Sequence, residues 1–185
     1  MFNNNYFTAV FAKSKNDVLG GDGKMLWRHA ADFLWFKGLT KGNAVIMGRK
    51  TFESLPNGAL PDRVNVVVTR NKKYKAPGCT VVHSLADAAR YLMRNHPSAI
   101  QYVIGGKELL EKALPHCKAA YITNINIDVN TDGIKDLVMA PKLPNNCVVT
   151  NTYELPTKVG NKEQTQCAAT VYVCEFTGPI KSIFD

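Results

Sequence analysis

Apolar positions along this chain fall into short continuous runs, and segments with helical periodicity separate most of these runs. The segments Ala44–Met47 and Val64–Thr69 are almost entirely apolar, which is typical of strands that are covered on both faces. We predict strands at about 6–12, 43–47, 63–69, 80–82, 101–104, 118–124, 146–153 and 168–176, helices at about 30–39, 50–55, 85–95 and 107–113, and a long loop over 13–24.

This order of elements predicts an α/β fold with a largely parallel sheet, because most strands are followed by a helix. No helix separates the last two strands, and their polar and apolar residues alternate more. We therefore expect them to form an antiparallel C-terminal hairpin. The sequence holds no repeat and no segment typical of a linker, so residues 1–185 are predicted to form a single domain.

The composition is that of a soluble protein with a core of its own. The chain has 185 residues, of which 45% are hydrophobic, and its longest apolar runs have only the length of a strand. The N-terminus lacks the basic region and apolar segment of a signal peptide, so we expect a cytoplasmic protein with no membrane association. The five cysteines and four histidines are scattered, with no C-x-x-C pair, and we expect neither disulfides nor a metal site.

The net charge of +8 favours anionic partners. Nucleic acid and a multiply phosphorylated cofactor both fit the charge by itself. The densest basic segment is only Asn71–Lys75, and no basic stretch interleaved with aromatic residues supports nucleic-acid binding, so we expect none.

The helix predicted at about 30–39 carries a carboxylate on the same face as apolar side chains. Asp32, Trp35, Phe36 and Leu39 follow at helical spacing, which places the acid on the same face as two aromatic rings and a leucine. An acid on an apolar face costs stability unless it is paired. Asp32 is therefore a candidate for substrate contact, although an acid in a first helical turn is also favoured by the helix dipole alone.

Two strand-to-helix turns contain glycine and could hold phosphate. In one, Gly48 precedes Arg49, Lys50 and Thr51; in the other, Gly105 and Gly106 precede a short helix. Each is also compatible with an ordinary turn. Two such turns in one α/β domain indicate a dinucleotide bound along the carboxyl ends of the strands, where Asp32 would meet it.

Five motifs in order resemble the dihydrofolate reductase family. They are Met25-x-Trp27, Asp32-x-x-Trp35-Phe36-Lys37, Val45-Ile-Met-Gly48-Arg49-x-Thr51-x-Glu53-Ser54, Leu60-Pro-x-Arg63-x-Asn65 and Val103-Ile-Gly105-Gly106. The resemblance covers nearly the whole chain. It implies an eight-stranded mixed sheet flanked by helices, and an oxidoreductase, usually monomeric, that reduces 7,8-dihydrofolate to tetrahydrofolate with NADPH by hydride transfer to C6 and protonation of N5.

The resemblance also assigns roles residue by residue. Asp32 matches the acid that binds the pterin, Thr123 the hydroxyl bonded to that acid, and Trp27 a residue that fixes an ordered water. Phe36 and Leu55 match residues on either side of the substrate rings, and Arg63 matches the partner of the substrate glutamate. The implied substrate contacts are Val10, Phe11, Ala12, Asp32, Phe36, Leu55, Leu60, Arg63, Ile104 and Thr123.

For the cofactor, the resemblance implies two phosphate-binding turns, Arg49 and Arg70 near the 2′-phosphate, and a cis bond between Gly105 and Gly106. The segment Asp17–Lys24 resembles a mobile flap over the nicotinamide. The implied cofactor contacts are Ala12, Leu19, Gly20, Gly48, Arg49, Lys50, Thr51, Thr69, Arg70, Ile104, Gly105, Gly106, Lys107, Leu109 and Leu110.

Leu26, Ala30, Lys107 and Leu110 depart from residues usual in the family. Three other functions are compatible with parts of the sequence: the related pyrimidine reductase of riboflavin synthesis, which lacks the Asp32 and Arg63 motifs; a nucleic-acid-binding protein; and a copy that has lost catalysis. The retained Asp32, Arg49 and Arg63 favour an active dihydrofolate reductase.

Overall fold

The computed structural model describes residues 6–159 and 167–184. Its elements are β1 (Phe7–Ser14), β2 (Val18–Gly21), α1 (Ala30–Thr40), β3 (Ala44–Gly48), α2 (Arg49–Glu53), β4 (Val64–Val68), β5 (Thr80–Val82), α3 (Leu85–Asn95), β6 (Gln101–Gly105), α4 (Lys107–Ala113), the 3₁₀ turn η1 (Leu114–His116), β7 (Cys117–Ile125), β8 (Leu137–Met139), β9 (Cys147–Leu155) and β10 (Ala169–Phe176).

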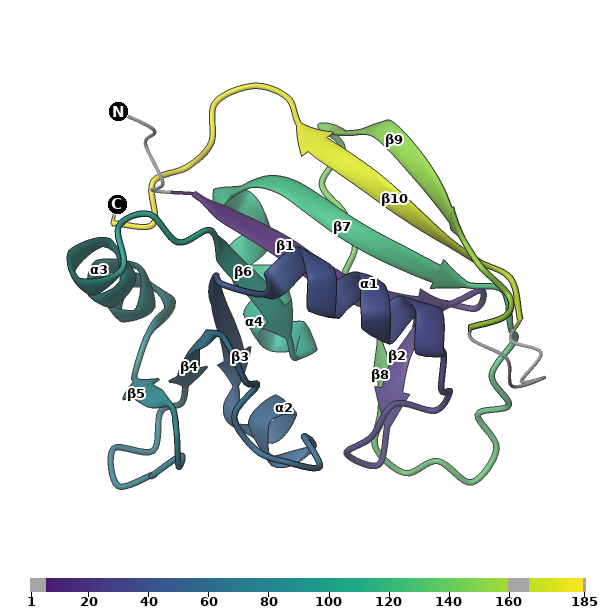
Figure 1. Cartoon of the computed structure of the whole chain (residues 1–185), viewed down its shortest axis with the longest axis horizontal. Coiled ribbons are helices and arrows are strands. Elements are labelled where there is room, and N and C mark those ends of the chain that lie inside the picture. The colour runs from purple at the N-terminus through teal and green to yellow at the C-terminus, as the bar shows by residue number, and fades with distance from the viewer. Residues whose placement is uncertain (1–5, 160–166, 185) are drawn as a thin grey trace.

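Eight strands form one mixed sheet in the order β5-β4-β3-β6-β1-β7-β10-β9 (Figure 1). The strands from β5 to β7 are parallel, while β10 runs antiparallel to both β7 and β9. The predicted α/β class, the mixed sheet and the antiparallel C-terminal hairpin are confirmed. In the parallel part, the carboxyl ends of β1, β3, β6 and β7 meet at one edge, which is where ligands bind in such sheets.

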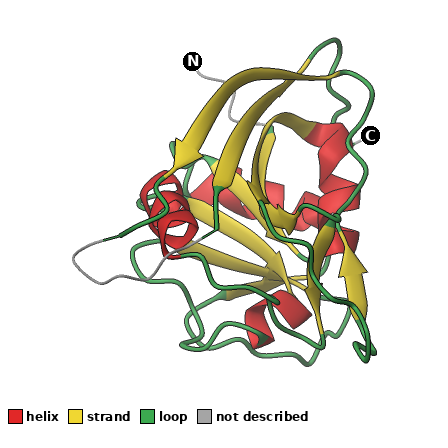
Figure 2. Ribbon diagram, turned by 90° about the vertical axis from the view of Figure 1, so that its right-hand side faces the viewer, coloured by secondary structure: helices red, strands yellow, loops and turns green. Residues whose placement is uncertain are grey.

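Helices cover both faces of the sheet (Figure 2). On one face, α3 and α4 bury a large apolar cluster that includes Leu92 and Leu110, both fully buried. On the other face, α1 and α2 pack over two smaller clusters, one around Val45 and Phe52 and one around Ile125. This two-sided burial explains why the central strands are apolar at nearly every position.

The prediction of a long loop over 13–24 is wrong. Strand β1 continues to Ser14, and Val18–Gly21 forms β2, which pairs with β8 in a separate two-stranded sheet. Two of the four residues of β2 are glycine and β8 is three residues long, so neither segment shows a strand pattern by itself. Pairing with a segment more than a hundred residues away stabilises β2.

Candidate active site

The predicted site residues meet at the carboxyl edge of the sheet, beneath α1. Ala12 of β1 pairs in register with Thr123 of β7, and Met47 of β3 pairs with Gly105 of β6. Helix α1 crosses the same face (Figure 1) and brings Asp32 to Thr123. Residues from distant parts of the sequence therefore line one side of the sheet edge.

Asp32 is a buried acid with a specific partner. Its residue is only 9% exposed, and burial raises the pKa of its carboxyl above the ordinary value of 3.8, while a hydrogen bond with Thr123 opposes that rise. Thr123 is itself buried on β7. An acid on an apolar face costs stability unless it is paired, and Thr123 is the partner of Asp32.

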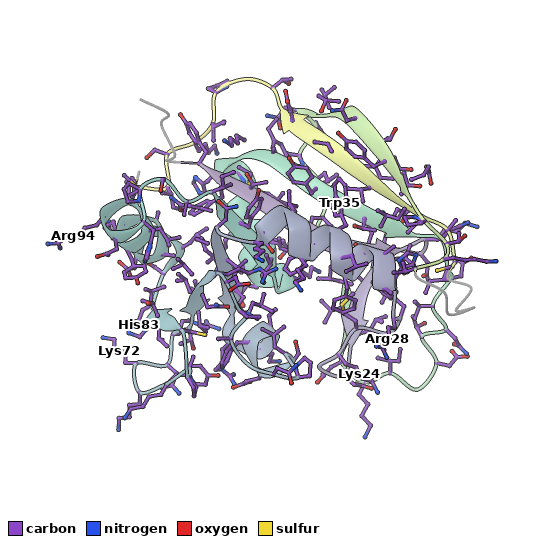
Figure 3. All side chains as sticks on the ribbon, viewed as in Figure 1. Lys24, Arg28, Trp35, Lys72, His83 and Arg94 are labelled. Carbon is purple, nitrogen blue, oxygen red and sulfur yellow. The ribbon has the colours of Figure 1, made fainter. Side chains whose placement is uncertain are left out.

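The apolar face predicted for α1 divides between two clusters. Phe36 and Leu39 pack with Val10 in the cluster under α2. Trp35 instead lies toward the C-terminal hairpin (Figure 3). Its ring centre is 5.2 Å from that of Tyr153 in β9. The helical spacing was correct, but it did not show that α1 spans the boundary between two parts of the sheet.

Most residues implied as substrate contacts gather in the cluster under α1 and α2. Partly buried Phe36, Leu55, Leu60 and Ile104 pack there against Val10. Phe11 is different, because its side chain is buried in the cluster on the opposite face of the sheet. Only the backbone of Phe11 is therefore available at this edge.

Arg63 is held by three hydrogen bonds from its guanidinium. Its Nε donates to Thr40 Oγ1 at 2.8 Å, Nη1 to the Pro61 carbonyl at 2.5 Å, and Nη2 to the Lys37 carbonyl at 3.1 Å. Buried Asn65 closes the preceding loop by exchanging two hydrogen bonds with the backbone of Leu60. A guanidinium has five N–H groups, so its bonds to the described residues leave two for an anion.

Trp27 brings a buried indole N–H, Nε1, for which the described part of the chain provides no acceptor. Its side chain packs in the cluster around Ile125, beside α1 and β7. Ala31, the neighbour of Asp32 in α1, packs in the same cluster.

The two glycine turns lie against each other. A Cβ built on Gly48 would come within 3.6 Å of the backbone nitrogen of Gly106, and one built on Gly106 within 3.3 Å of the Thr51 hydroxyl. The Gly105–Gly106 peptide bond is cis, as the family resemblance implied, and Gly105 has a φ of 129°. Within the described residues, no side chain caps the start of α2 or α4, so the first N–H groups of both helices are open next to these glycines.

Arg49 is fixed beside the first turn. Its Nη1 donates to both carboxylate oxygens of Glu53 at 3.0 Å, and its guanidinium lies 6.0 Å from the ring centre of Tyr74. Lys50 next to it is exposed. Tyr74 was missed in the sequence because it lies in the loop after β4, where nothing in the local pattern indicates a contact with α2.

Beside the second turn, charged side chains interact with one another. Lys107 forms an ion pair with Glu111 at 3.7 Å, and Arg70 lies near enough to contribute, after Lys112, to the lowered pKa of Glu108. Thr69 is buried at the end of β4, and its hydroxyl accepts from the N–H of Asn71. Leu109 is 8% exposed and Leu110 fully buried in the core under α3, so the side chain of Leu110 offers no surface to a cofactor.

The flap segment is attached to the loop before β8 through Asp22. Its Oδ1 accepts from the backbone N–H groups of Lys135 at 3.2 Å and Asp136 at 3.0 Å, and its own N–H donates to the Asp136 carbonyl. Lys24, by contrast, extends into solvent (Figure 3). Leu19 and Gly20 lie within β2, so the pairing of β2 with β8 sets their position.

We expect Asp22→Gly to speed release of the cofactor implied by the family resemblance by up to about thirtyfold, because the two lost hydrogen bonds are each worth about 1 kcal/mol net. Glycine tolerates the φ of 48° at this position, so the change removes contacts without adding strain. Stopped-flow measurement of cofactor dissociation checks the result. Asp22→Asn keeps the accepting oxygen and is the matched control; equal rates for both variants would exclude this role for the carboxylate.

Other kinds of site receive no support from the described residues. Among them, no three His, Cys, Asp or Glu side chains lie close enough together to hold a metal ion. None of the helices in residues 6–159 and 167–184 has the length and apolar character needed to cross a membrane. All five cysteines are free thiols.

Comparison with protein families gives a match to the dihydrofolate reductase model over residues 6–171. Among curated proteins, a type 3 dihydrofolate reductase of Salmonella typhimurium is 41% identical over 123 residues, which are 66% of this chain and 74% of that protein. The dihydrofolate reductase of Mycobacterium leprae is 37% identical over 136 residues, which are 72% of this chain and 79% of that protein.

Among solved structures, the dihydrofolate reductase of Enterococcus faecalis in complex with NADP(H) and RAB-propyl has a similar fold. The TM-score is 0.79 at 24% identity, and the match covers 95% of this chain and 98% of that one. At this identity the likeness establishes the fold.

Proposed function

The chain belongs to the dihydrofolate reductase family, and on that premise we propose that the site beneath α1 reduces 7,8-dihydrofolate to 5,6,7,8-tetrahydrofolate with NADPH. The observation that carries the proposal is the buried carboxyl of Asp32, bonded to Thr123 at the edge where β1 and β7 end. Such a group can bind the amino and ring nitrogens of a pterin through charge-assisted hydrogen bonds.

The residues around the glycine turns fit a dinucleotide with an additional phosphate. Glycine at positions 48, 105 and 106 lets a ligand approach the backbone, and uncapped N–H groups face the same place. Arg49, Lys50 and Thr51 would bind phosphate at the first turn, with Thr69 and Arg70 at the adenosine end. Ala12, Ile104 and the flap residues Leu19 and Gly20 would enclose the nicotinamide. The E. faecalis reductase of similar fold is in complex with NADP(H).

When bound, NADPH supplies the hydride that C6 of the pterin accepts. The chain's own residues orient the substrate and favour protonation of its N5. The negative charge of Asp32 favours the cationic imine electrostatically, and the proton reaches N5 through water held by the indole N–H of Trp27. Thr123 keeps the carboxyl directed at the ring.

For the rest of the substrate, we propose that Phe36 and Leu55 enclose the pterin and aminobenzoyl rings, with Val10 and Leu60 beside them. The two unused N–H groups of Arg63 would bind the glutamate carboxylate in bidentate geometry. The hydrogen bonds to Thr40, Pro61 and Lys37 hold the guanidinium in advance, which lowers the entropic cost of binding.

We expect Arg49→Ala to weaken NADPH binding about tenfold more than NADH binding, because only NADPH carries the 2′-phosphate that the guanidinium contacts. Arg90→Ala is the matched control: Arg90 also forms an ion pair, with Asp87, and lies over an aromatic ring, Phe184, but on α3. Dissociation constants for both cofactors from fluorescence titration decide the matter. Equal weakening of both would refute this role for Arg49.

The reaction is tested by following NADPH consumption by the purified protein with dihydrofolate, and separately with the pyrimidinone substrate of riboflavin synthesis. Turnover of dihydrofolate alone is expected, since the family match and the Asp32 and Arg63 motifs favour a folate substrate over the pyrimidinone. Turnover of the pyrimidinone alone, or of neither compound, would refute the proposed function.

We further propose that residues 1–185 act as one domain and that the protein works as a cytoplasmic monomer with small-molecule ligands only. All residues assigned to the reaction come from this chain, and the glycine turns and the substrate cluster share one sheet. A sedimentation experiment at assay concentration tests the monomer.

A further inference from the structure

His29, which played no part in the sequence argument, is buried directly before α1. It is 1% exposed and serves as the N-cap of the helix. Its Nδ1 accepts the backbone N–H of Asp32 at 3.2 Å, and its Nε2 lies 2.9 Å from the backbone oxygen of Cys167. Because a carbonyl oxygen only accepts, Nε2 must carry the hydrogen, which leaves Nδ1 as the acceptor. Both ring nitrogens are thus engaged.

These two bonds link Asp32 to the segment before β10. Cys167 stands two residues before β10, and Val171 of β10 pairs in register with Thr123 of β7. Thr123 in turn bonds the carboxyl of Asp32. The imidazole therefore connects the backbone of Asp32 to the segment that leads into β10, the strand beside β7, which carries Thr123. It thereby fixes the separation between α1 and the sheet at this point.

An ordinary cap would not do this. Asparagine, aspartate, serine or threonine at an N-cap accepts a backbone N–H, but the side chain is too short to reach a second strand as well. An imidazole offers an acceptor and a donor on opposite sides of a rigid ring. Ser84, which caps α3 by accepting the N–H of Asp87 at 3.0 Å, shows the ordinary arrangement in the same chain.

We propose that His29 is a positioning residue for the reductase reaction, which ties the first turn of α1 to β10 and so holds the carboxyl of Asp32 at Thr123. The inference rests on the proposed role of Asp32. His29 touches neither substrate nor cofactor; it acts through the backbone of Asp32.

The test compares His29→Ala, His29→Asn and Ser84→Ala by kcat, KM and the pH dependence of hydride transfer, each per folded protein. His29→Ala is expected to lower kcat about tenfold or more, since small misplacements of a reacting group are costly, with NADPH affinity unchanged within about twofold. The pH dependence should also change, because the substitution alters both the burial that raises the pKa of Asp32 and the interaction with His29 that lowers it. His29→Asn keeps an acceptor for Asp32 N–H and should lie between His29→Ala and the unaltered protein. Ser84→Ala should lose stability only.

A His29→Ala protein with unaltered kcat and pH dependence would overturn the inference. A His29→Asn protein with the kcat of the unaltered protein would also overturn it, because asparagine caps α1 without reaching Cys167. Thermal unfolding of each variant separates lost folding from lost turnover, and His29→Asn still tests the proposal if His29→Ala does not fold. Failure of the proposed function is distinct, because the unaltered protein would then not reduce dihydrofolate at all.

Discussion

Asp32→Asn is expected to lower the turnover of dihydrofolate at neutral pH by at least about tenfold, as for the loss of a general-acid contribution. Asparagine fills the same space beside Thr123 but carries no charge to favour the protonated imine. NADPH binding should be unchanged, because the glycine turns lie on other strands. Single-turnover hydride transfer measures the effect, and turnover within a factor of two of the unaltered protein would remove Asp32 from the mechanism.

The same substitution is expected to stabilise the protein at neutral pH. Burial raises the pKa of Asp32 in the folded state above its ordinary value of 3.8. The folded state therefore binds the proton more tightly than the unfolded state, and this contribution is full below the unfolded pKa and is lost as pH rises through the folded pKa. Asparagine never ionises, so it avoids that loss. Melting temperatures should be higher for Asp32→Asn near neutral pH and converge with those of the unaltered protein in acid; a difference that does not depend on pH would contradict this.

Arg63→Lys is expected to raise the KM for dihydrofolate by roughly tenfold to a hundredfold, corresponding to about 1.5–3 kcal/mol for hydrogen bonds to a charged group. Lysine keeps the charge, but it cannot donate to Thr40, Pro61 and Lys37 while presenting a bidentate pair to a carboxylate. Steady-state kinetics at saturating NADPH provide the measurement.

A dihydropterin without the glutamate tail is the matched control substrate for Arg63→Lys. The variant and the unaltered protein should turn it over alike, since it has no carboxylate for the guanidinium. An equal loss with both substrates would mean that Arg63 supports the fold of the loop closed by Asn65 and does not bind the tail.

The local residue pattern was enough to predict the helices and strands that bury a continuous apolar face. The helix predicted at 85–95 is α3 (Leu85–Asn95), because Ser84 caps it and its buried face repeats at helical spacing. It was not enough for β2 and β8, which are short, contain glycine or exposed residues, and are strands only because they pair with each other. Pairing between short strands that are far apart in the sequence gives neither strand a recognisable residue pattern.

In the candidate site, too, residues in local motifs were predicted and residues defined by long-range contacts were missed. Asp32 and the glycine turns stand in local motifs, and the family resemblance supplied Thr123 as the partner of the acid. His29, Asp22 and Tyr74 were missed because each has a partner on a distant segment of the chain. Cys167 lies 138 residues from His29, and Lys135 lies 113 residues from Asp22. Tyr74 contacts Arg49 of α2 from the loop after β4. A lone histidine or aspartate in a loop has many possible surroundings, and only the folded chain selects one.

The most direct test is the structure of the protein with NADP⁺ and folate bound together. The pterin ring should be hydrogen-bonded to the Asp32 carboxyl, its C6 should face the nicotinamide near Ala12 and Ile104, and the glutamate should reach Arg63. A pterin bound away from Asp32, or a cofactor that avoids the turns at Gly48 and Gly105, would contradict the mechanism proposed for this chain.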